Sequence, residues 1–239
     1  MNNRKRYNLI AIIISFICIF LLGCYTFYLK WQKEKNIFVY EEHLNDIVVT
    51  VGEQSVTLRE FSYYIAKMEK DVQEKALLYN PKDPMEYWNV HFSAGLDSGY
   101  MFEYAWNYAL ADCVCDLIFA KKARDEGYSL SENGYKQAEM QAEALYTMLS
   151  TEQIEKTGLT IDLIKMMEER RLLVQLYTKS FMGENELSGY IDNIMNCISG
   201  NSNMVMESEV ICNEDMKNNI RMGTITVNCE KVHRREYGE

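Results

Sequence analysis

A long stretch without charge near the start of the chain limits what this protein can be. A basic segment, residues 1–6, precedes 23 uncharged residues, 7–29, and a second basic cluster follows directly. At about 1.5 Å per residue, a helix of this length crosses the roughly 30 Å hydrocarbon layer of a bilayer. A cleaved secretory signal has an apolar stretch of only about 7–15 residues. The sequence therefore predicts a transmembrane anchor over residues 7–29.

The flanking charges predict which way the chain crosses the membrane. All the charges that precede the anchor are positive, which favours a cytoplasmic segment 1–6 and a C-terminal body on the extracytoplasmic side. Residues Leu21–Cys24 also resemble a lipobox, in which a small residue precedes the cysteine that becomes acylated. The apolar stretch continues beyond Cys24, which favours an uncleaved anchor, and lipidation of Cys24 is the alternative. In both cases the body is tethered to the cell membrane.

The chain beyond the anchor is strongly acidic. Residues 36–239 carry 19 basic and 34 acidic side chains, which gives a formal charge of −15. Because such a surface repels phosphate groups, we expect no nucleic-acid partner. The seven cysteines include no C-x-x-C motif and are accompanied by only three histidines, so we expect no metal site and no cofactor.

The body begins with signals for a β-hairpin that leads into a helix. Ile47–Val51 is a β-branched run, and a turn separates it from a second short strand, Val56–Leu58. Thr57 and Glu60 fit a capping box at the start of a helix. The core-facing stripe of that helix is predicted to be Phe61, Ile65, Met68, Val72 and Leu77.

Further helices follow in the sequence. The pattern over Ser98–Glu126 is apolar on more than one face and predicts the central helix, which ends at Gly127. Capping residues Ser131 and Thr160 predict two more helices. These two helices span Glu132–Leu149 and Ile161–Phe181. Two others are predicted at Glu184–Ile198 and, as a short helix, at Met85–Phe92.

The tail is predicted to return to the first strand. Val205–Ile211 and Ile225–Val227 have strand patterns, with a helical turn near Glu214–Arg221 between them. Because an isolated hairpin is marginal in water, we expect Ile47–Val51 to pair with a strand within Val205–Ile211. The predicted fold is mainly α: a transmembrane helix, a spacer over residues 30–45, and one helical domain, 46–239, whose ends are joined by a small β element.

Three segments in this order resemble the SurA/PrsA-type extracytoplasmic chaperones. The hairpin Val48–Val51, Gly52 and Val56–Phe61 is similar to their opening "valine–glycine–x–x–x–isoleucine–threonine" hairpin and helix. Residues 123–132 resemble the family's joint between two helices, "A-x-x-x-G-hydrophobic-x-hydrophobic-[S/T]-x-E". The stretch from Leu77 to Trp88 is similar to anchored members of the group. The resemblance covers roughly residues 46–182 and implies a SurA N-terminal-like helical domain.

The resemblance implies binding of unfolded or exported polypeptides without catalysis. The catalytic parvulin domain of PrsA-type foldases has about 90 residues, whereas only 57 residues follow Met182 here, without a Gly-Gly pair. The alternatives are a diverged peptidyl-prolyl cis-trans isomerase and an envelope scaffold that binds one defined partner.

Aromatic side chains concentrate between residues 87 and 108, and the chain has 14 methionines. Such side chains suit binding of varied unfolded chains, because they adapt to different partners. The predicted peptide contacts are Tyr87, Trp88, Phe92, Tyr100, Tyr104 and Tyr108, and we expect Phe102 and Trp106 in the core. No catalytic residue is predicted: Asp112 and Asp116 fit the solvated side of a helix, and 168–171 fits helix-surface charge.

Overall fold

The computed structural model describes residues 19–26, 38–94, 97–180, 184–198 and 209–227. The chain divides into two compact units, Met1–Val39 and Tyr40–Glu239. In the first unit, residues 19–26 are helical, and Cys24 is exposed. No helix within the described ranges has both the length and the hydropathy for crossing a bilayer. Because most of residues 7–29 and all of segment 1–6 lie outside the described residues, the anchor stays a prediction.

The second unit begins earlier than the sequence predicts. Tyr40–His43 forms a 3-10 turn, η1, in which the Tyr40 side chain is only 4% exposed. The Tyr40 hydroxyl and Ser62 Oγ share a hydrogen bond of 2.8 Å. Leu44 is buried as well. The prediction of a spacer extending to residue 45 is therefore wrong for residues 40–45, because two apolar side chains among them belong to the core.

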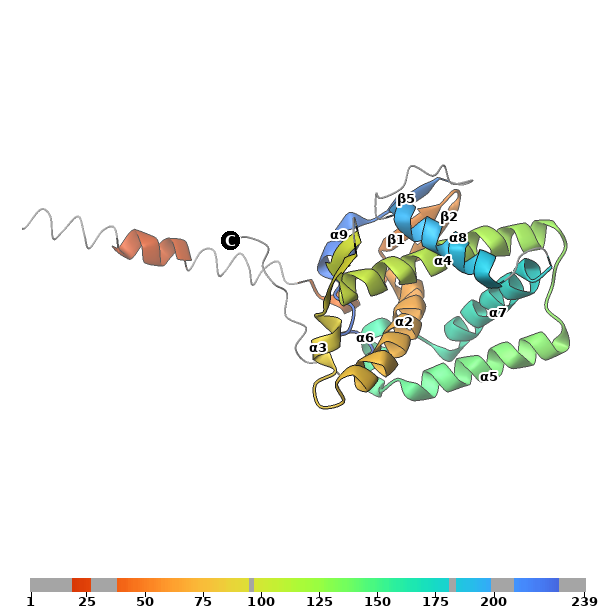
Figure 1. Ribbon diagram of the computed structural model, residues 1–239, viewed down its shortest axis with the longest axis horizontal. Helices are drawn as coiled ribbons and strands as arrows, with labels where there is room; N and C mark the ends of the chain where they lie inside the picture. Colours follow the sequence, from red (N-terminus) through yellow and green to blue (C-terminus); the bar gives the residue numbers. More distant parts are fainter. Residues whose placement is uncertain (1–18, 27–37, 95–96, 181–183, 199–208, 228–239) are drawn as a thin grey trace, which may run out of the picture. The chain divides into compact units, whose positions relative to one another are not determined.

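A three-stranded antiparallel sheet joins the two ends of the body. Its strand order is β2-β1-β5, in which β1 is Ile47–Val51, β2 is Gln54–Thr57 and β5 is Val210–Cys212. The register places Val49 opposite Cys212. The predicted return of the tail to the first strand is confirmed (Figure 1). The predicted tail strand, Val205–Ile211, overlaps β5 at two residues, and its residues 205–208 lie outside the described part of the chain.

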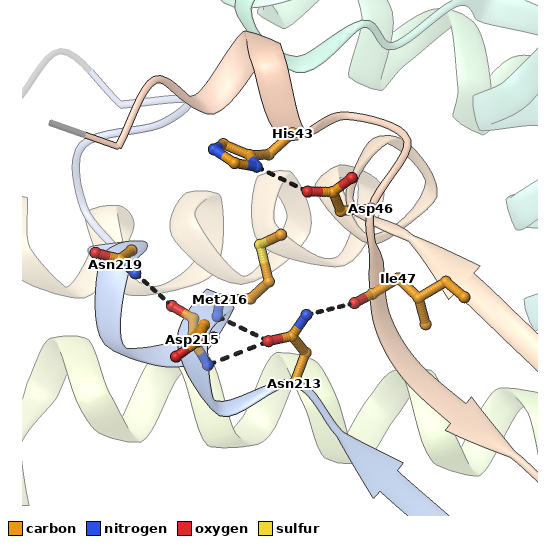
Figure 2. Close-up of polar contacts among 7 residues, drawn as sticks. All are labelled: His43, Asp46, Ile47, Asn213, Asp215, Met216 and Asn219. Carbon is orange, nitrogen blue, oxygen red and sulfur yellow. Dashed lines mark hydrogen bonds and ion pairs between the residues drawn. The ribbon is translucent and has the colours of Figure 1, made fainter. Parts of the chain in front are cut away.

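One asparagine connects the tail strand to the start of the body. Figure 2 shows Asn213 between Ile47 and the short helix α9, Glu214–Asn219. Its Nδ2 donates to the Ile47 carbonyl at 3.0 Å, and its Oδ1 accepts from the Asp215 and Met216 amides. Asn213 is thus both the cap of α9 and a cross-link to β1. Its second role depends on a contact 166 positions apart in sequence.

Helix α2, Leu58–Tyr79, begins with the predicted capping box between Thr57 and Glu60. Its buried stripe differs from the prediction. Leu77 is 47% exposed, and the buried positions of the stripe include Glu69 and Ala76. The buried positions keep a spacing of three or four residues through Glu69, Val72 and Ala76, so Leu77 lies one residue past the stripe. The prediction of Leu77 as a core residue is therefore wrong.

The central helix, α4, spans Met101–Asp125 and packs against α2, α7 and α8 (Figure 1). Every residue from Cys113 to Ala120 is buried, so the prediction of burial on several faces is confirmed. Trp106 is also in the core, as expected.

The structure corrects the start of this helix and the end of the preceding one. The helix α3 covers only Met85–Trp88, and an antiparallel hairpin of β3, His91–Ala94, and β4, Asp97–Tyr100, separates it from α4. Asp, Ser and Gly are poor helix formers, and they occupy the first three positions of β4. The Tyr100 amide donates to Glu103 Oε2 at 2.9 Å, which starts α4 after the strand.

The helices after α4 follow the predicted caps. Ser131 precedes α5, Glu132–Met148, and Thr160 precedes α7, Ile161–Thr178. Each of these two side chains accepts a hydrogen bond from a backbone amide in the first turn of its helix. Gly127, at φ +80°, ends the α4 segment as expected. A helix that we did not predict, α6, spans Thr151–Thr157. Helix α8, Glu184–Ile198, completes the set, and α5 runs alongside α7 (Figure 1).

The last described residues form a buried turn. The predicted strand Ile225–Val227 is wrong, because these residues curve in a bend after α9. Met222 and Ile225 are buried. Gly223 adopts φ +88°, and a Cβ added there would lie 2.6 Å from Cδ2 of the buried Trp88 ring. Only glycine combines this φ with so close an approach to an indole.

We expect Gly223→Ala to destabilise the body more than Gly52→Ala. Both glycines have positive φ, but a Cβ at Gly52 meets no atom within 4 Å. Gly52→Ala should therefore cost only the backbone strain, about 1–2 kcal/mol. Gly223→Ala should add an overpacking cost of about 1–3 kcal/mol. Urea unfolding of both variants gives the comparison, and equal losses would contradict the packing against Trp88.

Candidate functional site

The six predicted peptide contacts do not form one surface. Trp88 is fully buried, and its Nε1 donates to Gln73 Oε1 at 2.9 Å. The assignment of Trp88 as a peptide contact is therefore wrong: it is a core residue whose one polar atom is satisfied within the body. The other five positions reach the surface to different degrees and belong to three separate groups of rings.

The first group forms an exposed apolar surface at the end of α2. The apolar tip, as we name it, consists of Leu77, Leu78, Tyr79 and Tyr87. Leu78 is 87% exposed and Tyr79 is 57% exposed. The rings of Tyr79 and the half-buried Tyr87 lie 5.4 Å apart. Sequence analysis found Tyr87 but placed Leu77 in the core, and it did not single out Leu78 or Tyr79.

A tight loop holds the apolar tip in place. Asn80 Oδ1 accepts hydrogen bonds from the amides of Lys82 and Asp83, at 3.1 and 3.2 Å. Asn80 Nδ2 donates to Glu86 Oε2 at 2.7 Å, which ties the end of α2 to α3. The two helices are in contact, and α3 lies beside the end of α2 in Figure 1. These bonds fix the spacing between Tyr79 and Tyr87.

The second group follows the β3–β4 hairpin. The Tyr100 ring packs edge-on against His91 at 4.9 Å and stacks on Phe102 at 5.5 Å. The Arg221 guanidinium lies 3.8 Å from the centre of the Phe102 ring, a cation–π contact with the tail. Phe92, on the same hairpin, is 38% exposed. Tyr100 is thus engaged within the body, whereas Phe92 is open to solvent.

The third group links α4 to α8. The Tyr104 and Tyr108 rings lie 4.8 Å apart, and the Tyr108 hydroxyl donates to Asp192 Oδ1 at 2.8 Å. Burial raises the pKa of Tyr108, and the hydrogen bonds with Tyr104 and Asp192 raise it further. Tyr108 therefore stays a neutral donor at physiological pH. It fastens α8 to α4, and Tyr104, at 41% exposure, is the more accessible of the two.

Ionisable side chains also meet inside the helical core, where α2, α4 and α7 pack. We name this set the core charge cluster. Lys67 Nζ pairs with Glu168 Oε1 at 2.9 Å, and the Tyr64 hydroxyl donates to Asp116 Oδ2 at 3.2 Å. Asp116 is 5% exposed and Glu168 is 1% exposed. The remaining members are Asp112, Arg170 and Arg171.

The expected solvated positions of Asp116 and Glu168 are therefore wrong. Periodicity treats an acid as a surface residue, whereas here three carboxylates face three cations across helix boundaries and their formal charges balance. Burial raises the pKa of Asp116 to about 6, and Arg171 opposes that rise. Burial likewise raises the pKa of the Cys113 thiol, so it is not a reactive thiolate. With Asp116 and Glu168 buried, the cluster serves packing between helices.

A second buried acid holds the tail. Glu69, on α2, is fully buried, and its two carboxylate oxygens accept five hydrogen bonds from the turn Gly223–Thr226. Four of the donors are backbone amides, and the fifth is the Thr226 hydroxyl. Burial raises the pKa of Glu69, whereas the bonds from Thr226, Ile225 and Gly223 lower it. Because amides donate and do not accept, this arrangement selects the carboxylate over the protonated acid.

The carbonyls of the same turn are bound from the opposite side. Gln153 Nε2 donates to the Thr226 carbonyl at 2.8 Å, and Lys156 Nζ donates to the Thr224 carbonyl at 3.1 Å. Both side chains come from α6, the helix that the sequence analysis missed. Sequence analysis also missed Glu69, although an acid at a core-facing position of an apolar stripe was a signal that a buried partner was required.

Comparison of the chain with protein-family models, curated proteins and solved structures finds no match. Within the described ranges, no group of three or more His, Cys, Asp or Glu side chains is placed to hold a metal ion. The acids Glu69, Asp116 and Glu168 are buried, and each accepts hydrogen bonds from groups of the body. The apolar tip is different, because its side chains are exposed and held in position. It is the candidate functional site.

We expect Glu69→Gln to destabilise the body by about 3 kcal/mol. The side-chain NH₂ group of glutamine would face N–H groups of the tail turn, and it cannot accept hydrogen bonds from them. Glu74→Gln is the matched control, since Glu74 is exposed on the same helix, and it should change stability by less than about 0.5 kcal/mol. Denaturant unfolding measures both. If the two variants have the same stability, the carboxylate does not hold the tail.

We expect Asp116→Asn to flatten the pH dependence of stability between about pH 4 and pH 6. The native state keeps the Asp116 proton up to about pH 6, whereas the unfolded chain loses it near pH 4, so this residue lowers stability as pH rises through that window. The pKa of Asp116 is about two higher in the native state than in the unfolded chain, and this difference lowers the free energy of unfolding by about 3 kcal/mol across the window.

The measurement is a series of urea titrations from pH 4 to pH 7 on the wild type and the variant. Asp83→Asn, at an exposed loop position, controls for the loss of one carboxyl group and should follow the wild-type curve. Parallel curves for wild type and Asp116→Asn would refute the assignment of a raised pKa to this residue.

Proposed function

We propose that this chain is a membrane-tethered, extracytoplasmic, chaperone-like protein that binds unfolded or exported polypeptides without catalysis. The observation that carries the proposal is the apolar tip. Leu78 and Tyr79 are exposed at the end of α2, and the half-buried Tyr87 lies beside Tyr79 on α3. Burial of such surface against a partner contributes about 25 cal/mol per Å², and exposed apolar patches mark binding surfaces.

The chemistry of the tip favours varied partners over one defined partner. Leu78 and Tyr79 offer apolar area without an accompanying charged pair, so a client needs only apolar side chains to bind. The resemblance of the hairpin, of the joint at residues 123–132 and of the stretch Leu77 to Trp88 to SurA/PrsA-type chaperones supports the same interpretation. The uncharged stretch 7–29 supports a tether to the membrane, with the body outside.

Two alternatives predict different behaviour. A diverged peptidyl-prolyl isomerase would accelerate cis-trans exchange of proline peptides in a protease-coupled assay, and turnover above background would favour it. An envelope scaffold would bind a single partner and leave unrelated denatured proteins to aggregate.

We expect the full chain, reconstituted in nanodiscs, to suppress aggregation of several unrelated denatured proteins, as followed by light scattering. The double substitution Leu78→Ser/Tyr79→Ser should weaken client binding about tenfold or more, because it removes the apolar area that the client covers. Both positions are exposed, so the fold should be retained, which thermal unfolding verifies.

The matched control is Leu176→Ser on α7, where the leucine is 44% exposed but lies outside the apolar tip. It should leave suppression unchanged. Empty nanodiscs control for adsorption of clients to lipid. If Leu176→Ser weakens suppression as much as the double substitution, apolar exposure in general, and not the tip, accounts for binding. If the wild type suppresses no client, the proposal is wrong.

A further inference from the structure

A cavity of about 310 Å³ lies where the end of α4 and the start of α5 meet α7, and no residue of the tail lines it. Its walls come from the loop after α4 and from facing turns of α5 and α7. Arg124 and Ser129 are exposed at this cavity, and Tyr135 is 46% exposed, so solvent reaches it. The volume is at the lower end of the range for small-ligand sites.

The loop that forms one wall is held by hydrogen bonds. The Tyr128 amide donates to the Ala123 carbonyl at 2.8 Å, which closes the end of α4. The Tyr128 hydroxyl donates to Ser180 Oγ at 3.2 Å, and the Tyr177 hydroxyl donates to Glu126. These contacts fasten the loop to the end of α7. The wall is therefore formed before any ligand arrives, which lowers the entropy cost of binding.

Basic side chains outnumber acidic ones in the lining of the cavity, although the chain is acidic. Arg124 and Arg170 line it together with a single acid, Glu169. The Arg124 guanidinium makes no hydrogen bond or ion pair within the described part of the chain, and Arg170 Nη1 is shielded from solvent without a hydrogen-bond partner there.

The remaining walls are apolar. Leu130, Met166 and Leu173 line the cavity beside two tyrosine rings. A matching ligand has an anionic group for the arginines, an apolar side chain, and an N–H for Glu169. Guanidinium groups bind carboxylates with two parallel hydrogen bonds. An apolar α-carboxylate with a neighbouring N–H has all three features, and it occurs at the C-terminus of a peptide and in a free amino acid.

We propose that this cavity binds the C-terminal carboxylate of a peptide that ends in an apolar residue. A peptide provides the amide N–H for Glu169 without the full positive charge of a free amino acid, which the two arginines would oppose. This inference does not rest on the apolar tip: the two sites share no residue, and each can be tested with the other intact.

The test is calorimetric titration of the full chain in detergent micelles with N-acetyl-alanyl-leucine, its C-terminal amide, and free leucine. We expect the free acid of the peptide to bind at least about tenfold more tightly than the amide, since the amide loses a charge-assisted pair. Arg124→Gln should weaken binding of the acid by a similar factor. Tighter binding of free leucine than of the peptide would reassign the site to free amino acids and overturn the peptide proposal.

Lys121→Gln is the matched control, because it removes the same charge from the same end of α4 outside the cavity lining. It should bind the peptide like the wild type. Tyr135→Ser, also at an exposed position, tests the apolar wall and should weaken the acid and the amide equally. Equal affinity for acid and amide in the wild type, or an Arg124→Gln variant that binds as tightly as the wild type, would refute the proposal.

Discussion

The body depends most on one buried carboxylate. Glu69 binds four consecutive backbone amides of the tail turn, and α6 binds carbonyls of the same turn from the other side. A buried turn without such partners would leave polar backbone groups unsatisfied, at a cost of about 1–3 kcal/mol each. The acid therefore makes it possible for a polar segment to close the core over Trp88.

This closure connects the other parts of the fold. The same tail provides β5, which completes the sheet, and Asn213, which bonds to Ile47 (Figure 2). Segments that are far apart in sequence thus stabilise each other, residues 47–51 at the start of the body and residues 210–213 in its tail. The core charge cluster adds a second constraint, because three helices must keep their relative positions for its charges to balance.

The two open sites differ from the two buried ones in a way that bears on function. Glu69 and Asp116 are sealed, and their partners come from the body, so they contribute to stability and specificity of packing. The apolar tip and the arginine-lined cavity are accessible to solvent, and each offers groups that the fold does not use. These groups are the exposed apolar area of Leu78 in the tip and the guanidinium N–H donors of Arg124 in the cavity. Binding by either requires no change of the fold, because hydrogen-bonded loops already hold both.

The sequence by itself determined the local structure: the capping box at Thr57, the caps at Ser131 and Thr160, the glycine at 127 and the burial of α4 all follow from short-range patterns. It also indicated that the tail returns to β1, because a lone hairpin needs a partner. Only the tertiary structure decided which polar residues are buried and which apolar ones are exposed. Glu69, Asp116 and Glu168 look like surface residues, and Leu77 looks like a core residue, until partners more than 40 positions away are known. For the same reason the sequence placed the fully buried Trp88 among the peptide contacts and left out Arg124: burial and access depend on contacts between distant segments, and side-chain type and spacing do not encode them.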